Sequence, residues 1–344
     1  MNIKSLLLGS AAALAVVSGA HAADAIVAAE PEPAEYVKVC DAFGKGYFYI
    51  PGSETCLKIG GRVRFDVAAA DSYGVNTDNG WRTKSRAELY IDSATDTEYG
   101  ALKTQIVTRF DFDGDYNDGQ HTTTKLIAGN ITLGGLLVGL ADSQYSSYTG
   151  YAGDIINDDV VGYGEFEVNQ IAYNFDAGNG FTAVVSLEDD SRTGEEYIPD
   201  VVVGAGYSAG GFGFKVVGGY DESLDTGAVK ARIDGTFGAL SAFVMAGYNF
   251  DGIVNKFAPD NEGFNVGWGD WAVWGGLGYA FTDKVSANVQ LAYTDSETFA
   301  AAANVKFAPV AGFIIQPEVT YTKFDNAVTD DDQWNGMLRV QRTF

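Results

Sequence analysis

The C-terminal stretch WNGMLRVQRTF, residues 334–344, decides the fold class of this chain. One set of alternate positions is mostly apolar and includes Trp334, Leu338, Val340 and Phe344. The intervening set is mostly polar and includes Asn335, Arg339, Gln341 and Thr343. Because successive side chains of a β-strand point to opposite faces, this alternation predicts an amphipathic strand that ends on an aromatic residue.

The same alternation recurs from Leu57 onward, in segments of about ten residues that end in turns rich in glycine, asparagine and aspartate. Short turns such as Gly134-Gly135 alternate with longer, more acidic loops at 111–123, 142–169 and 251–270. We count sixteen segments up to Phe344, an even number that returns both chain ends to one side of a membrane. The pattern therefore predicts an all-β fold, a closed antiparallel transmembrane β-barrel of sixteen strands over residues 57–344. A soluble β-sandwich alternates in the same way and is the alternative interpretation.

The N-terminus has the features of a cleaved export signal, which favours the barrel over the sandwich. Lys4 precedes an apolar run over residues 5–17, and Ala20-His21-Ala22 fits a small-x-small cleavage site. The apolar run is too short for a typical membrane-spanning helix. We therefore expect residues 1–22 to be a removed signal peptide, residues 23–56 to form a periplasmic lead-in, and the mature protein to lie in the bacterial outer membrane.

The chain has two cysteines, Cys40 and Cys56. In an exported protein, such a pair at short spacing predicts a disulfide. Its closure would stabilise the lead-in by about 3 kcal/mol in the chain-entropy model. A metal site would need more ligands nearby, so we expect no metal and no cofactor.

The charge balance is strongly acidic, with 46 acidic against 22 basic residues and a formal net charge of −24. This surplus disfavours nucleic acid as a partner and attracts cations.

Basic residues gather on one face of the first three segments and the last, which are neighbours in a closed barrel. Strand parity places these side chains inward as a "basic wall" of Arg62, Arg64, Arg86, Lys103, Arg109 and Arg339, with Arg82 and Lys84 on the same face. The loop 142–169 has no lysine or arginine but carries Tyr145, Tyr148, Tyr151, Asp154, Asp158, Asp159, Glu165 and Glu167. If this loop folds inward, the opposed charges create a transverse field across a water-filled lumen. Alternatively, the loop acids are merely solvated and the arginines pair locally with Glu88 and Asp66.

Three motifs carry a family resemblance. They are YVKVCDAFGKGYFYIPG at residues 36–52, INDDV at residues 156–160 and GDWAVWGGL at residues 269–277. The chain resembles the alphaproteobacterial porins of the Brucella and Rhizobium type over essentially its whole length. The resemblance implies a sixteen-stranded trimeric diffusion channel whose third external loop, 142–169 here, folds into the lumen. We accordingly expect the constriction to be formed by Tyr151, Asp154, Asp158, Asp159 and Glu165, and Phe344 to close the barrel.

The resulting hypothesis is a general diffusion porin that passes ions and small hydrophilic solutes passively, with a mild cation preference. Expected partners are two further copies of the chain, outer-membrane lipid and lipopolysaccharide, and the barrel assembly machinery during insertion. One alternative is a sugar-selective channel lined by Tyr145, Tyr148 and Tyr151. The other is a structural barrel or adhesin whose lumen is plugged by residues 23–56.

Catalytic and calcium-binding motifs are weak. His121 is the only histidine after residue 22, so a Ser-His-Asp triad would have to use it, and we expect no enzyme. Residues 111–118 resemble a calcium loop, but Gly119 comes one place late and no glutamate follows at the required distance. A solvated turn explains these residues better.

Overall fold

The computed structural model describes residues 38–70, 80–115, 119–189, 197–260, 266–325 and 332–344. The predicted signal peptide and residues 23–37 of the lead-in lie outside the described residues. The elements are β1 (Phe48–Tyr49), β2 (Cys56–Ala70), β3 (Gly80–Thr97), β4 (Gly100–Asp115), β5 (Gly119–Leu133), β6 (Leu136–Asp142), α2 (Gln144–Ser147), β7 (Glu167–Asp176), β8 (Phe181–Glu188), β9 (Asp200–Ala209), β10 (Phe212–Asp221), β11 (Thr226–Phe237), β12 (Leu240–Asn249), β13 (Trp271–Thr282), β14 (Val285–Thr294), β15 (Thr298–Val310), β16 (Phe313–Phe324) and β17 (Asp332–Thr343). None of the helices in the described ranges has the length and apolar character needed to cross a membrane.

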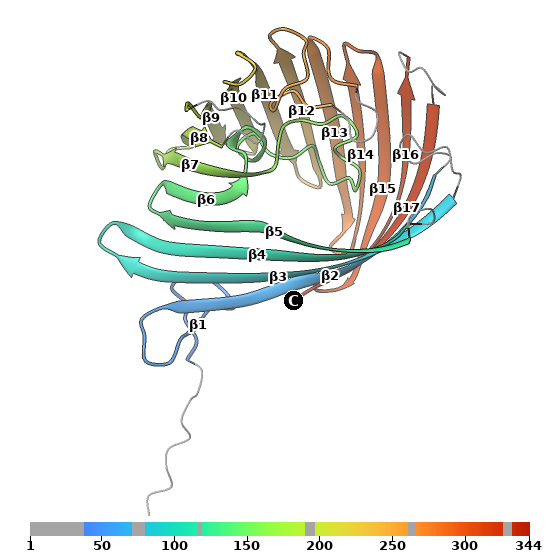
Figure 1. The fold of residues 1–344 in the computed structure, drawn as a ribbon. Coiled ribbons are helices and arrows are strands. Elements are labelled where there is room, and N and C mark those ends of the chain that lie inside the picture. The colour runs from blue at the N-terminus through green and yellow to red at the C-terminus, as the bar shows by residue number, and fades with distance from the viewer. Residues whose placement is uncertain (1–37, 71–79, 116–118, 190–196, 261–265, 326–331) are drawn as a thin grey trace, which may run out of the picture. The chain divides into compact units, whose positions relative to one another are not determined.

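Strands β2 to β17 form one closed antiparallel barrel (Figure 1). Each strand pairs with the next, and β17 pairs with β2 in a register that sets Arg339 opposite Asp66. Phe344 continues this ladder, because its backbone N–H donates to Gly61 O at 2.9 Å and its carbonyl accepts from Gly61 N at 3.0 Å. The predicted all-β barrel of sixteen strands is confirmed.

The polar stretch 111–123 was predicted to be a loop, and that prediction is wrong. Strand β4 runs on to Asp115 and β5 begins at Gly119. The inward aspartates Asp111 and Asp113 face basic side chains on β3, which satisfies their charge inside the barrel. Charge alone therefore did not mark the end of the strand.

Most of the outer face of the barrel is apolar, as the alternation predicts. Val63 and Phe65 on β2, for example, are 54% and 43% exposed in the isolated chain. Trp274 does not belong to this outward face. It lies on the inward face of β13, only 1% exposed, and donates from Nε1 to Val161 O at 2.9 Å.

The interior of the barrel is not uniformly wet. A cluster of buried aromatic and apolar side chains fills the side formed by β8 to β13 and includes Tyr145, Tyr148, Tyr163, Met245, Phe257, Trp268 and Trp274. These residues come from inward strand positions and from the connections 143–166 and 250–270. Burial of this apolar area holds segment 143–166 and the residues around Phe257 and Trp268 inside the barrel.

Cys40 and Cys56 form the predicted disulfide, which ties residues 39–55 to the start of β2. The pair is separated by 16 residues, and β1 extends the ladder by pairing Phe48 with Leu57.

Replacing Cys40 and Cys56 together with serine is expected to destabilise residues 39–55 by about 3 kcal/mol, because the unfolded loop regains its chain entropy. Limited proteolysis should then cleave this region while the barrel stays heat-resistant in electrophoresis. Equal protease resistance with and without reductant in the unaltered protein would contradict this expectation.

Candidate functional site

The connection between β6 and β7, segment 143–166, enters the interior of the barrel. It begins with the short helix α2, whose preceding residue Ser143 accepts a hydrogen bond at Oγ from Tyr145 N at 3.1 Å. The two ends of the segment meet where Ser143 N donates to Phe166 O at 2.7 Å. The segment is therefore a closed loop with a narrow neck, which Figure 1 shows in green inside the ring of strands.

The tip of segment 143–166 is bound to the opposite wall. Glu318 on β16 accepts hydrogen bonds from Ile156 N at 2.6 Å and Asn157 N at 2.9 Å. On β15, Asn304 Nδ2 donates to Asp154 O at 2.8 Å and Lys306 Nζ pairs with the Asp154 carboxylate at 2.8 Å. These inward side chains hold the tip across the barrel from β6 and β7.

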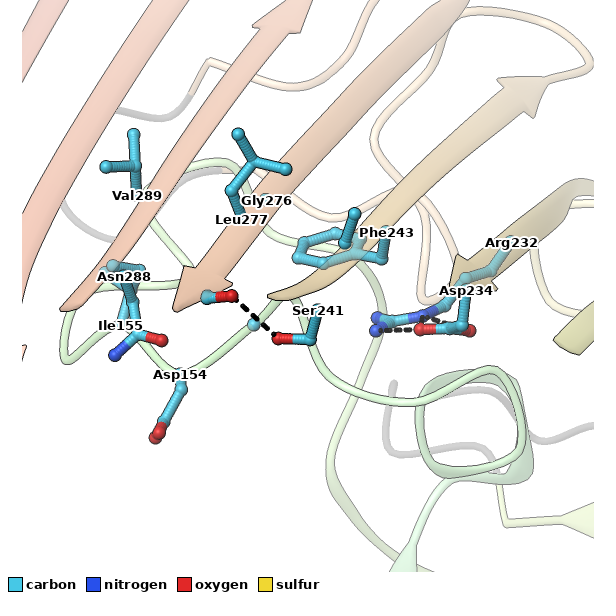
Figure 2. A pocket seen from close by; sticks show the side chains of 13 residues that line it. Asp154, Ile155, Arg232, Asp234, Ser241, Phe243, Gly276, Leu277, Asn288 and Val289 are labelled. Carbon is cyan, nitrogen blue, oxygen red and sulfur yellow. Dashed lines mark hydrogen bonds and ion pairs between the residues drawn. The ribbon is translucent and has the colours of Figure 1, made fainter. Parts of the chain in front are cut away.

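A small polar pocket lies between the segment and β11 to β14 (Figure 2). Arg232 and Asp234 are joined there at 2.7 Å, and the Arg232 guanidinium lies 4.1 Å from the centre of the Phe243 ring. The pocket encloses about 140 Å³, room for only a few water molecules. Next to this pocket, segment 143–166 lies close to the inner face of β11 to β14.

The wide space lies on the other side of the segment, toward β2 to β5. A cavity of about 990 Å³ is bounded there by Arg62, Arg86 and Arg109 of the basic wall and by Tyr151, Asp158 and Asp159 of the segment. A second cavity, of about 390 Å³, lies between Arg64, Arg86 and Arg339 of the wall and Asp158. Acidic and basic side chains thus face each other across open space.

Much of the charge on the basic wall is paired with acids of the same wall. Glu88 accepts from Arg62 at 2.9 Å and from Arg109 at 2.7 Å. Bidentate ion pairs join Arg86 to Asp111 and Arg339 to Asp66, with distances of 2.7 to 2.9 Å between guanidinium nitrogens and carboxylate oxygens. Local pairing with Glu88 and Asp66 therefore occurs together with the inward segment.

Arg64 differs from its neighbours. Its Nε donates to the amide oxygen of Gln341 at 3.1 Å, and within the described ranges no carboxylate pairs with it. Its positive charge is thus not neutralised by a direct ion pair, and it lines the smaller cavity.

Asp158 has an unusual protonation equilibrium. Burial, followed by the nearby Asp159 carboxylate, raises the pKa of Asp158 to about 7. The hydroxyl of Tyr163 donates to Asp158 Oδ2 at 2.7 Å, which opposes part of this rise. The charge facing the basic wall therefore changes near neutral pH.

The structure brings together only part of the predicted site. Tyr151, Asp158 and Asp159 face the basic wall, whereas Asp154 turns to Lys306 and Glu165 lies 3.6 Å from Lys256. On the wall itself, Arg62, Arg64, Arg86, Arg109 and Arg339 line the two cavities. Lys103 is also on β4, opposite Ala94, but it lines neither of them.

Two of the three loop tyrosines are buried and do not line the cavity in front of the basic wall. Tyr145 is fully buried, and Tyr148 is 9% exposed, with its hydroxyl 2.8 Å from Thr182 Oγ1. Only Tyr151, at 44% exposure, is open to solvent. A sugar path formed by all three rings is therefore absent from this conformation.

Sequence reasoning missed the residues that hold the segment, namely Lys256, Trp268, Trp274, Lys306 and Glu318, together with Lys230, whose Nζ donates to the Tyr163 carbonyl. Strand parity could have placed Lys230, Lys306 and Glu318 inward, because they alternate with apolar outward residues. Lys256 and Trp268 lie in a loop and gave no periodic signal. Within the described ranges, no group of histidine, cysteine and carboxylate side chains is arranged to hold a metal ion.

Comparison with known proteins identifies the family. The model of the family described as "Porin subfamily" matches residues 24–341. The chain belongs to the porin subfamily. Porin Omp2b of Brucella suis biovar 1 is 44% identical to this porin over 367 residues, and the match covers 100% of both chains.

Solved structures share the fold of this porin at low sequence identity. The outer membrane channel DcaP of Acinetobacter baumannii matches with a TM-score of 0.67 at 17% identity, over 86% of this chain and 99% of that one. An anion-selective porin from Comamonas acidovorans matches with a TM-score of 0.57 at 12% identity, over 85% and 100% of the two chains. The family and the barrel make this porin a general diffusion channel of the bacterial outer membrane.

Proposed function

We propose that segment 143–166 is the constriction of this channel and that the channel is mildly cation-selective. The observation that carries the proposal is the cavity of about 990 Å³ between the basic wall and Asp158 and Asp159. Four of the wall's basic groups are paired with Glu88, Asp111 and Asp66, so part of their positive field is compensated. The segment acids and the net charge of −24 then favour cations.

The transport is passive in this proposal, and no catalytic step is involved. Solutes pass through the charged space between segment and wall, where the transverse field sorts them by size and charge. The segment 23–56 is a periplasmic lead-in rather than a plug, after removal of residues 1–22 as a signal peptide. Outer-membrane lipid, lipopolysaccharide and the barrel assembly machinery are the remaining proposed partners.

The direct test reconstitutes the mature protein in planar bilayers and measures conductance steps and the reversal potential across a potassium chloride gradient. Open steps with a potential that favours potassium support the proposal. An anion-favouring potential would mean that the basic wall outweighs the segment acids. A silent membrane would favour the plugged structural barrel instead.

The cation preference is expected to rise with pH through about 7. Below that pH Asp158 is protonated and neutral; above it, the carboxylate adds a negative charge beside the basic wall. We expect the permeability ratio of potassium to chloride to be about twofold higher at pH 8.5 than at pH 5.5 at low salt, where screening is weak.

Asp158→Asn provides the control for this pH dependence. The amide is neutral at every pH and has nearly the same shape, so the variant should behave as the unaltered channel does at pH 5.5. A pH step of equal size in the variant would show that another group is responsible.

We also propose that the protein is a homotrimer whose subunits meet through the outer faces of β3 to β5. Hydroxyl side chains occupy many outward positions of these strands: Thr83, Ser85, Ser93, Thr95, Thr104, Thr108, Thr122 and Thr124. By contrast, the outward positions of β8 to β12, β14 and β15 carry only apolar residues, aromatic residues and glycine. Outward polar residues on other strands, such as Asn169 of β7, Lys323 of β16 and Arg342 of β17, are amide or charged groups and not hydroxyls.

Hydroxyl groups fit contact between copies better than contact with lipid. Small hydroxyl residues allow close packing and hydrogen bonding between membrane-embedded surfaces, whereas lipid-facing bands are apolar. Ser93 and Thr104 already hydrogen-bond each other at 2.6 Å on this face. Two further copies of this chain are therefore the proposed occupants of the surface.

A further inference from the structure

The connection 250–270, between β12 and β13, places a lysine inside the barrel. The side chain of Asn255 shapes a tight turn, because its Oδ1 accepts from Phe257 N at 2.9 Å and from Ala258 N at 3.0 Å. Phe257 packs against Tyr145 with ring centres 5.0 Å apart. Between these contacts lies Lys256, whose side chain is only 3% exposed.

Lys256 is surrounded by acceptors from three other parts of the chain. Its Nζ lies 2.8 Å from Asp200 Oδ2 at the start of β9 and donates to the carbonyl of Asp189 at 2.7 Å. The carboxylates of Glu165 and Glu188 lie at 3.6 and 4.0 Å. One ammonium group therefore neutralises part of the charge of three carboxylates.

Two of these carboxylates contact or form part of the neck of segment 143–166. Glu188 binds the first limb, because it accepts from Ser143 Oγ at 2.7 Å and from Gln144 N at 2.8 Å. Glu165 is part of the returning limb, where its carbonyl accepts from Ser146 Oγ at 2.7 Å. Lys256 thus contacts the carboxylates that define both limbs of the neck.

We propose that Lys256 is a positioning residue that keeps the neck of segment 143–166 closed. The closed neck fixes the distance between the tip of the segment and the basic wall. The proposal rests on the proposed role of this segment as the constriction. Without the ammonium group, the carboxylates of Glu165, Glu188 and Asp200 are buried together and repel one another. The neck opens to let water solvate them, and the segment becomes mobile.

The test compares Lys256→Met with Lys284→Met, which alters an exposed lysine in the turn between β13 and β14. Hydrogen exchange of peptides from 143–166 is measured on the refolded protein in detergent, independently of conduction. We expect exchange about tenfold faster in Lys256→Met and no change in Lys284→Met, because only the first leaves buried carboxylates uncompensated. In bilayers, Lys256→Met should also close at lower voltage and show more open-channel noise, at unchanged heat resistance of the barrel.

Glu165→Gln keeps the test decisive if Lys256→Met does not fold, because it leaves the pair of Lys256 and Asp200 intact. We expect faster exchange of 143–166 in this variant too. If Lys256→Met folds and hydrogen exchange of 143–166 is unchanged, the proposal is overturned. If Lys256→Met does not fold, unchanged exchange of 143–166 in Glu165→Gln overturns it. If the unaltered protein carries no current in bilayers, the proposed constriction is refuted. The hydrogen-exchange result still decides whether Lys256 keeps the neck closed, because it does not depend on conduction.

Discussion

Replacing Thr108 with tryptophan is expected to convert the proposed trimer into monomers. Thr108 lies at an outward position of β4, between Leu89 of β3 and Leu126 of β5, within the hydroxyl-rich face. An indole is too large for a closely packed surface built on threonine and serine, and it prevents the neighbouring subunit from approaching. Electrophoresis of unheated samples should then show a folded monomer in place of the trimer band.

Ala303→Trp is the matched control, because Ala303 is a small outward residue at the middle of β15, far around the barrel from β4. An indole there faces lipid and is expected to leave the trimer intact. Loss of the trimer in Ala303→Trp with its retention in Thr108→Trp would assign the interface to the other side of the barrel. Monomers in the unaltered protein would contradict the trimer itself.

The barrel and the composition of the basic wall could be predicted because both depend on a period of two. Once Trp334 to Phe344 is a strand, parity fixes which side chains point inward, and closure makes β17 the neighbour of β2. Arg64 and Arg339 therefore had to share a face, although 275 positions separate them in the sequence numbering. No knowledge of side-chain contacts was needed.

The ion-pair partners of the acidic residues in segment 143–166 could not be predicted from strand parity. Asp154 pairs with Lys306 and Glu165 with Lys256, and both pairings depend on how far an aperiodic segment reaches across the barrel. The reach is set by the buried aromatic cluster, in which Trp274 donates to Val161 O and Trp268 to Gly162 O. Such contacts follow from three-dimensional packing and leave no regular pattern in the sequence.

The packing also explains why the open space lies on one side. The apolar side chains on the inner face of β8 to β13 are buried by segment 143–166 and by Phe257, Ala258 and Trp268 of the connection between β12 and β13, which removes them from water. Many of the inward residues of β2 to β5 are charged, so covering them would cost desolvation energy. The segment therefore lies against the apolar side and leaves the charged side hydrated.

Replacing Glu318 with leucine is expected to release the tip of segment 143–166. The Glu318 carboxylate accepts from Ile156 N, Asn157 N and Asn157 Nδ2 on the tip, and from Asn304 Nδ2 on the wall. Hydrogen bonds to a charged group contribute about 1.5–3 kcal/mol each, so the tip loses several kcal/mol of binding to β16. Single-channel recordings should show closure at markedly lower voltage and strong open-channel noise.

Glu318→Gln is expected to give an intermediate effect, because its amide oxygen still accepts from Ile156 N or Asn157 N. Glu54→Leu removes an exposed carboxylate of the disulfide loop and should leave the recordings unchanged. If Glu318→Leu gates at the same voltage as the unaltered channel, the remaining bonds from Asn304, Lys306 and Trp274 suffice to hold the segment. The binding energy of the tip would then reside in β13 and β15, and Glu318 would contribute only charge to the interior.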